Sequence, residues 1–211
     1  MEKERIRQAY LDYVLRHQQP PASVYLLAQQ LGLSEAEFYR YYPGFAAIDR
    51  DIWADLGREA RRRAEAELVW TQYSAREKLL GYYFTLLELL KHNRSYALLS
   101  LSRSLPRVPG LTPPVLDDFR QDFEAFVAEI LREGRVSEEV ARRPLVQEQY
   151  PRLFWQQALF VLGYFAKDES LNFERTDAAV EKAVRLSFDL VAPNTLDSAL
   201  DLARFLFQSR R

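Results

Sequence analysis

The sequence predicts an all-α fold of about ten helices, with a small three-helix domain at the N-terminus and a larger helical domain after it. Apolar side chains recur three or four residues apart in successive segments, which is the period of a helix with one buried face. Glycine is rare, with 7 among 211 residues, whereas a β-rich fold needs many more turns. Two Ser-x-x-Glu capping boxes, Ser34–Glu37 and Ser74–Glu77, mark helix starts.

The first domain, residues 1–60, is predicted to contain three short helices and most of a long one. Pro20 and Pro21 end the first helix, because proline lacks the backbone N–H that a helix interior needs. Ser23 is a good cap for the second helix, and Gly32 suits the turn after it. The expected helices are 2–17, 24–31, 34–41 and 45–67.

The second domain, residues 61–211, is predicted to hold the remaining helices. They are expected at 74–92, 95–105, 114–133, 145–167, 175–191 and 195–208. The arginine run at 61–63 is interpreted as a solvated connector. The segments 145–167 and 175–191 are apolar around more of their circumference than one chain can cover. We therefore expect a homodimer built on these two helices.

The composition excludes several kinds of site. The chain has no cysteine, which rules out disulfides and thiolate metal sites, and its two histidines, His17 and His92, belong to no ligand-spaced cluster. No nucleophile–base pair, carboxylate pair or glycine-rich phosphate loop is present. We therefore expect neither an enzyme nor a cofactor nor a metal. The N-terminus has no apolar signal core and no segment is long enough to span a bilayer, so the expected location is cytoplasmic.

The second and third helices have the spacing of a helix-turn-helix. In such a motif a tight turn joins two short helices, and the second helix is presented to the DNA major groove. Here the turn is Gly32-Leu33, and residues 34–41 would face the groove. The small core is expected to consist of Leu27, Leu31, Leu33 and Phe38.

Segment 23–48 carries five features in a fixed order: a helix-capping serine, a Leu-Ala pair, a Gly-x-Ser turn, an aromatic run and a rigid corner. They are Ser23, Leu27-Ala28, Gly32-Leu33-Ser34, Phe38-Tyr39-Arg40-Tyr41-Tyr42 and Pro43. This pattern resembles the TetR family of bacterial helix-turn-helix regulators. The resemblance implies a repressor that binds double-stranded DNA and responds to a small molecule. The implied DNA-binding residues are Ser23, Ser34, Glu35, Tyr39, Arg40 and Tyr42.

Two features depart from the family pattern. Phe45 stands where the family has a phosphate-binding lysine, and the recognition helix carries Glu35 and Glu37 where small polar or basic residues are usual. Residues 1–60 hold seven basic and nine acidic side chains, a net charge of −2. This charge opposes tight DNA binding, because most protein–DNA hydrogen bonds go to the sugar-phosphate backbone of the DNA. Glu37 is expected to be held by its capping box, and Glu35 can accept from a cytosine amine.

An alternative function comes from segment 164–191, which resembles the last helices of TetR-like proteins that dimerise through a four-helix bundle. The run Asp168, Ser170, Phe173, Thr176 and Asp177 is also similar to a TetR-like lipid-binding accessory protein of ubiquinone biosynthesis. That resemblance implies a vestigial helix-turn-helix and a membrane-touching final helix. From the residues alone, Asp168 and Ser170 are interpreted as turn and cap residues. Helix 195–208 is expected to pack on its own domain, with membrane contact as the alternative.

Aromatic residues make up 13% of the chain and gather after residue 70. Helical bundles commonly place ligand pockets between their helices. We therefore expect a hydrophobic small molecule or lipid as the ligand, with ordinary core packing as the competing interpretation of each residue. The expected lining residues are Phe84, Leu87, Phe119, Phe123, Phe126, Phe154, Trp155 and Leu159.

Overall fold

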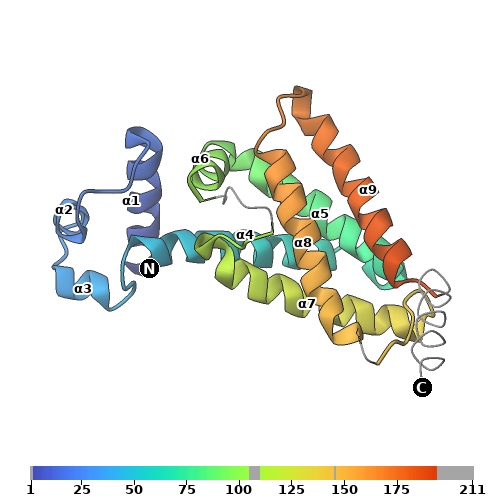
Figure 1. The fold of residues 1–211 in the computed structure, drawn as a ribbon. Coiled ribbons are helices and arrows are strands. Elements are labelled where there is room, and N and C mark those ends of the chain that lie inside the picture. Colours follow the sequence, from blue (N-terminus) through green and yellow to red (C-terminus); the bar gives the residue numbers. More distant parts are fainter. Residues whose placement is uncertain (1, 105–109, 145, 194–211) are drawn as a thin grey trace, which may run out of the picture. The chain divides into compact units, whose positions relative to one another are not determined.

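The structure, a computed structural model, describes residues 2–104, 110–144 and 146–193. Over these residues it contains α-helices and short 3-10 turns and no strand, so the predicted all-α class is confirmed (Figure 1). The predicted helix 195–208 lies outside the described residues. The helices are α1 (Glu2–His17), α2 (Val24–Gln30), α3 (Glu35–Tyr39), α4 (Phe45–Glu65), α5 (Ala75–His92), α6 (Arg94–Ser104), α7 (Asp117–Val136), α8 (Tyr150–Phe165) and α9 (Glu174–Val191).

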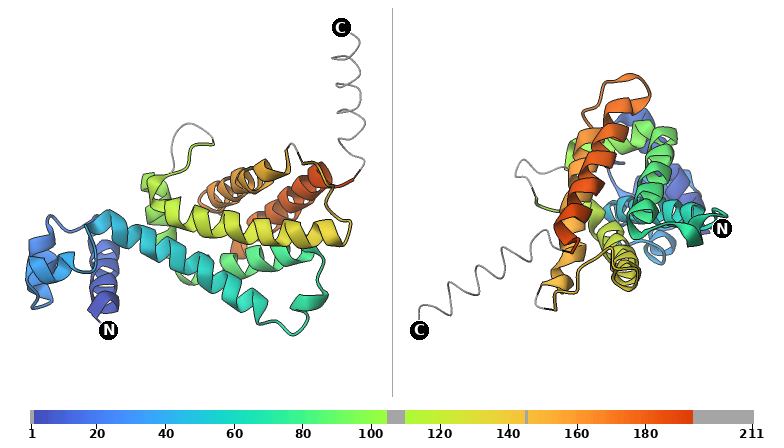
Figure 2. Two further views of the ribbon diagram at one scale, coloured as in Figure 1. Left: turned by 90° about the horizontal axis from the view of Figure 1, so that it is seen from below. Right: turned by 90° about the vertical axis from the view of Figure 1, so that its right-hand side faces the viewer.

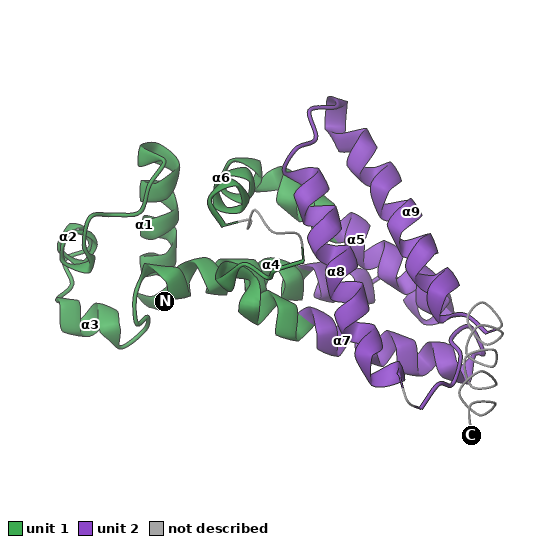
Figure 3. Cartoon of the chain, in the orientation of Figure 1, with its two compact units in different colours: residues 1–59, 86–122 green, residues 60–85, 123–211 purple. Residues whose placement is uncertain are grey.

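The chain divides into two compact units, coloured separately in Figure 3. The first unit contains residues 1–59 and 86–122, and the second unit contains residues 60–85 and 123–211. The first boundary between the two units falls inside α4, after residue 59, next to the domain boundary predicted at residue 60. Helix α6 and the start of α7 nevertheless belong to the same unit as α1, α2 and α3. The assignment of separate DNA-binding and ligand-binding domains stays a prediction.

The turn between α2 and α3 has a defined geometry. Gly32 adopts a φ of +67°, a left-handed conformation that an L side chain rarely adopts. The Leu33 N–H donates to the Ala28 carbonyl at 2.9 Å, and the Gly32 N–H donates to the Gln29 carbonyl at 3.0 Å. This pair of bonds is a Schellman motif, which ends α2 and lets the chain reverse into α3 within a few residues.

A half-buried carboxylate joins three helices of the first unit. Asp49 on α4 accepts hydrogen bonds from the Tyr10 hydroxyl on α1 at 2.8 Å and from the Tyr96 hydroxyl on α6 at 2.7 Å. Nearby, the indole N–H of Trp53 donates to Ser100 at 2.9 Å. Polar contacts as well as apolar packing thus hold α1, α4 and α6 together.

The second unit has an aromatic core and an outer pair of helices. Tyr82 on α5 lies 4.9 Å from Phe126 and 5.7 Å from Phe123 on α7, measured between ring centroids, and Phe123 lies 5.9 Å from Trp155 on α8. Helices α8 and α9 run side by side (Figure 2). No described helix has the length and hydropathy of a membrane span.

The start of α9 is capped from the preceding loop rather than by its own first residue. The Asp168 carboxylate accepts from the Ser170 N–H at 2.8 Å, the Thr176 N–H at 2.8 Å and the Thr176 hydroxyl at 2.6 Å. The Ser170 hydroxyl accepts from the Arg175 N–H at 3.2 Å. The interpretation of Asp168 and Ser170 as turn and cap residues is therefore confirmed. Burial alone would raise the pKa of Asp168, but these hydrogen bonds outweigh it and hold the pKa at about 2.

We predict that Asp168→Ala lowers the free energy of unfolding by about 1–2 kcal/mol at pH 7, because the Thr176 N–H and hydroxyl at the start of α9 and the Ser170 N–H of the loop lose their acceptor. A depressed pKa means that the carboxylate stabilises the fold above its ordinary titration range. The difference between wild type and variant should therefore be constant from pH 8 to about pH 5. It should shrink as the pH falls toward the folded-state pKa of about 2. Urea unfolding across this pH range measures it.

The matched control for this experiment is Glu169→Ala, which removes the neighbouring, exposed carboxylate of the same loop. We expect it to change stability by less than about 0.5 kcal/mol, as is usual for exposed surface positions. Equal losses in the two variants would show that the capping account of Asp168 is wrong.

Candidate functional site

Helix α3 is short and is held by a complete capping box. The Ser34 hydroxyl accepts from the Glu37 N–H at 3.2 Å, and the Glu37 carboxylate accepts from the Ser34 N–H at 2.8 Å. The hydrogen bond from the Ser34 backbone, followed by the one from its hydroxyl, lowers the pKa of Glu37. The predicted capping role of Glu37 is confirmed, so its carboxylate is already occupied on the helix that would face DNA.

The structure places most of the predicted DNA-binding residues on the surface of the helix-turn-helix. Ser23 caps α2 by accepting from the Leu26 N–H at 3.3 Å. Glu35 and Arg40 are exposed, and Tyr39 has 51% of its surface exposed. These side chains come from the cap of α2, from α3 and from the residue directly after α3.

Tyr42 requires a correction, because it does not lie on the surface. Only 3% of its surface is exposed, and its hydroxyl donates to the Asp51 carboxylate at 2.6 Å. The same carboxylate binds Lys3 at 2.9 Å. Burial, followed by the bond to Asp51, raises the pKa of the Tyr42 hydroxyl. Tyr42 therefore anchors the chain after α3 to α4 instead of reaching toward a partner.

Three exposed apolar or aromatic side chains near this surface were missed as site residues. Tyr25 and Leu26 on α2 and Tyr41 just after α3 are all exposed. The sequence feature that indicates the exposure of Tyr25 and Leu26 is the helical period, because these two residues directly precede the buried pair Leu27 and Ala28. The exposed surface of the motif is therefore rich in tyrosine rather than in basic residues.

Most basic side chains of residues 2–60 are already paired with carboxylates of the first unit. Lys3 pairs with Asp51, Arg5 with Glu2, Arg7 with Glu4 and Asp55, Arg50 with Asp118, and Arg58 with Asp55 and Asp122. Among the described residues, Arg16 and Arg40 take part in no ion pair. Arg40, at the end of α3, is thus the unpaired cation of the recognition helix.

The residues predicted to line a ligand pocket lie mostly in tightly packed cores. Phe84 is partly exposed, whereas the other seven are buried. Phe119 contacts Trp53 in the first unit, and Phe154 contacts Phe188 in the second, with ring centroids 6.3 Å and 5.4 Å apart. None of the eight lines a pocket that lies between α8 and α9.

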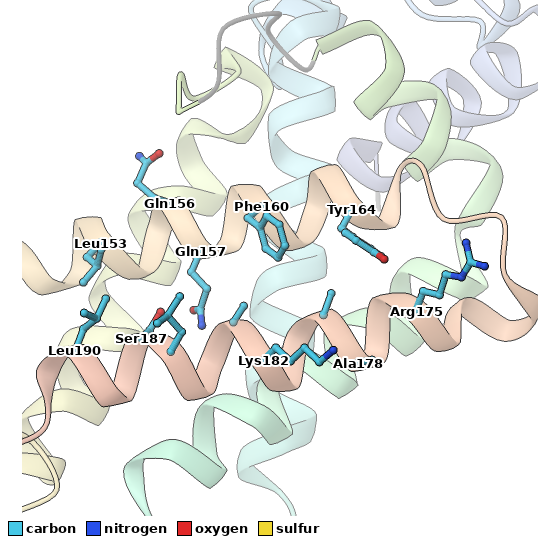
Figure 4. Close-up of a pocket in the computed structure, with 13 residues that line it drawn as sticks. Leu153, Gln156, Gln157, Phe160, Tyr164, Arg175, Ala178, Lys182, Ser187 and Leu190 are labelled. Atoms are coloured by element: carbon cyan, nitrogen blue, oxygen red, sulfur yellow. The ribbon is translucent and has the colours of Figure 1, made fainter.

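That pocket is an open groove of about 720 Å³ along the outer side of α8 and α9 (Figure 4). Its apolar lining includes Leu153 and Phe160 on α8 and Leu186 on α9, all of them large side chains exposed on the described surface. Arg175 and Lys182 on α9 add two cations to the lining. The groove lies on α8 and α9, the two helices whose broad apolar surface predicts a dimer.

The floor of the groove contains one buried polar side chain with an incomplete set of partners. Gln157 on α8 is 7% exposed and its Oε1 accepts from the Tyr83 hydroxyl at 3.1 Å. Its Nε2 is buried and has no hydrogen-bond partner among the described residues. The described residues contain no group of His, Asp or Glu side chains suited to a metal ion.

Comparison with known proteins connects this geometry to a family. Residues 78–206 match the family model described as "Tetracyclin repressor-like, C-terminal domain". No curated protein matches the sequence. Among solved structures, a candidate TetR-family transcription regulator from Shewanella sp. PV-4 is similar, with a TM-score of 0.61, 16% identity, and coverage of 91% of this chain and 98% of that one.

The transcriptional repressor QsdR of R. erythropolis, from the TetR family, is similar with a TM-score of 0.54 and 16% identity, over 90% of this chain and 93% of that one. At this identity the two structures show a shared fold. The matched family model covers more than half of the chain and extends from α5 past the end of α9. The chain therefore belongs to the TetR family of transcriptional regulators.

Proposed function

We propose that this protein is a DNA-binding repressor that acts as a homodimer and responds to a hydrophobic ligand. The observation that carries the proposal is the helix-turn-helix surface, in which a Schellman turn and a capping box present an exposed α3. Tyr39 and Arg40 stand at its end and are free to meet a DNA backbone. Such a helix is the part of the motif that enters the major groove.

The contacts to DNA are expected to be mainly hydrogen bonds from hydroxyl groups, with few charged contacts. Five of the seven basic side chains of residues 2–60 are engaged in ion pairs. Phosphate oxygens accept readily from tyrosine and serine hydroxyls as well as from arginine. We therefore assign phosphate contacts to Tyr39 and Arg40, with the exposed Tyr25 and Tyr41 as further donors, and leave out Tyr42.

The homodimer is supported by the outer face of α8 and α9. Phe160 has 52% and Leu186 has 60% of its surface exposed, and both line the groove. Contiguous exposed apolar surface of this kind marks an interaction site. A two-fold dimer would cover the same face on both chains. It would also provide the paired recognition helices that read two half-sites of an operator.

The ligand is proposed to be hydrophobic, because the interior of the second unit is lined almost wholly by aromatic and aliphatic side chains. Phe123, Phe126 and Trp155 are fully buried there. A ligand that enters this interior has to displace packed aromatic rings, since close-packed interiors leave few voids. Its binding should therefore be coupled to a change in the packing of α5, α7 and α8.

The lipid-binding accessory protein remains the second candidate, because the internal pairing of basic residues leaves little free positive charge for DNA. The helix that would touch a membrane in that case, 195–208, lies outside the described residues. DNA binding by the purified protein separates the two candidates.

We predict that Arg40→Ala weakens binding to operator and non-operator DNA alike. Loss of one phosphate contact in each protomer should reduce the slope of log K against log salt by about 2 for the dimer. The measurement is fluorescence anisotropy with fragments from around the protein's own gene, at several salt concentrations. Arg132→Ala, an exposed arginine of α7 in the second unit, is the control and should bind as wild type does. If the wild-type protein binds no fragment at low salt, the accessory function replaces the repressor.

We predict that Phe160→Glu converts the protein into a monomer, because it places a charge in the middle of the apolar groove, where burial would leave it unpaired. Sedimentation at micromolar concentration should give about twice the chain mass of 24.7 kDa for the wild type and one chain mass for the variant. Val136→Glu, at a still more exposed apolar residue that ends α7, should stay dimeric. A dimeric Phe160→Glu protein would place the interface on another face.

We predict that acyl chains or aromatic compounds raise the melting temperature, because a ligand that binds only the native state stabilises it. At 100 times the Kd the gain is about 2.7 kcal/mol, or a shift of roughly 5–10 °C for a chain of this size. Thermal unfolding with a panel of compounds measures it, and sugars and nucleotides should have no effect. The melting temperature of the Phe160→Glu variant should rise by the same amount with the ligand. If the ligand no longer raises the melting temperature of this variant, the ligand binds in the α8–α9 groove.

A further inference from the structure

The start of α3 offers one side chain that can form a new hydrogen bond. Glu35 is the first residue of the helix and is exposed, and its carboxylate takes part in no hydrogen bond or ion pair among the described residues. Ala36 has no polar side-chain atom, and Phe38 is fully buried. One oxygen of the Glu37 carboxylate accepts from both the N–H and the hydroxyl of Ser34, each at 2.8 Å. The group that remains to bind a partner is therefore the Glu35 carboxylate.

The two ends of α3 are suited to different parts of a DNA duplex. In a helix-turn-helix the N-terminal residues of the recognition helix contact the base edges. Tyr39 and Arg40, to which we assign phosphate contacts, are at the other end of α3. Glu35 precedes Tyr39 by four residues, so the two side chains lie on the same side of the helix, roughly 6 Å apart along its axis. With Tyr39 at the DNA backbone, Glu35 is placed at the base edges in the major groove.

A small residue beside Glu35 allows α3 to approach the bases closely. Successive side chains of an α-helix are about 100° apart around its axis, so Ala36 lies nearly opposite Phe38. Phe38 is packed into the core of the motif, and Ala36 is exposed on the other side. A methyl group at this outermost position does not hold the helix away from the floor of the groove. The neighbouring carboxylate of Glu35 can then come within hydrogen-bond distance of a base.

The chemistry of a carboxylate selects one base in the major groove. A carboxylate accepts hydrogen bonds and cannot donate them. In this groove guanine presents two acceptors, thymine presents an acceptor and a methyl group, and adenine presents an acceptor beside its donor. Cytosine presents its N4 amine as a donor and no acceptor. Cytosine is therefore the base that attracts a carboxylate, whereas the lone pairs of the other three bases repel it.

We propose that Glu35 is a specificity-determining residue that accepts a hydrogen bond from the N4 amine of one cytosine in each half-site of the operator. The inference rests on the proposed DNA binding and names the base that this side chain reads. A carboxylate is repelled by the phosphate backbone, so it contributes to the discrimination between sequences and adds nothing to non-specific affinity. In a two-fold dimer the two cytosines occupy symmetric positions on opposite strands.

The first test selects bound sequences from a pool of random-sequence DNA duplexes with the full-length wild type, Glu35→Ala and Glu35→Gln. The wild type should enrich a symmetric sequence with a cytosine at one fixed position of each half-site. Glu35→Ala should lose the preference at that position and keep the others. Glu35→Gln should change it to adenine, because a glutamine amide binds N6 and N7 of adenine together. Glu169→Gln, the same change at an exposed position of the second unit, should select the wild-type sequence.

Modified bases in the selected duplex test the hydrogen bond itself. N4-methylcytosine pairs with guanine while its methyl group replaces the amine hydrogen that points into the major groove. The control, 5-methylcytosine, carries a methyl group on the neighbouring atom and keeps both amine hydrogens. The wild type should bind the N4-methylated duplex about 5–20 times more weakly than the control duplex, measured by fluorescence anisotropy. Glu35→Ala should bind the two duplexes equally.

The outcomes separate this inference from the proposed function. If both Glu35 variants select the wild-type sequence, or if the position that changes prefers another base than cytosine in the wild type, the inference is wrong while DNA binding stands. Equal binding of the two methylated duplexes by the wild type contradicts it in the same way, as does a wild type that binds duplexes without enriching any sequence. A wild type that binds no duplex at low salt overturns both the inference and the proposed repressor.

Discussion

The carboxylate of Asp49 is the interaction on which the first unit depends. It lies half-buried at the junction of α1, α4 and α6, where the Tyr10 and Tyr96 hydroxyls donate to it. Burial raises the pKa of Asp49, and the two hydroxyl bonds oppose that rise. A carboxylate partly withdrawn from water is stabilised by its donors, so the two hydroxyl bonds favour the observed arrangement of the three helices. The helix-turn-helix thus belongs to a compact unit that also includes α6.

The helices and their caps could be predicted from local signals, because capping residues, prolines and apolar period act within a few positions. Where a predicted helix boundary differs from the structure, a local feature of the sequence explains the difference. The predicted helix 145–167 begins at Tyr150, since Pro151 is tolerated only in the first turn. The membership of α6 in the first unit could not be predicted, because it depends on the Asp49–Tyr96 contact across 47 positions of the sequence. The spacing of apolar residues does not indicate which tyrosine hydroxyl will bind which carboxylate far away in the sequence.

The candidate site was predictable where it depended on the helix-turn-helix and less so where it depended on packing. Tyr39 and Tyr42 belong to one aromatic run, yet one is exposed and the other is buried against Asp51, because the chain turns into α4 between them. The aromatic residues assigned to a pocket lie in core, since apolar spacing identifies a buried face without telling whether a cavity lies behind it. Gln157 interrupts an apolar helix, and this was the available signal for the groove.

The internal pairing of basic side chains has a consequence for how a repressor of this kind would find its operator. Non-specific attraction to DNA comes almost entirely from counterions that protein cations release. A first unit in which five of the seven basic side chains of residues 2–60 are held by its own carboxylates has little of that attraction. Such a protein spends less time on the vast excess of non-target sequence in a chromosome, so a larger share of its molecules stays free. Occupancy of the operator then depends on the specificity ratio more than on overall affinity, and few copies per cell suffice.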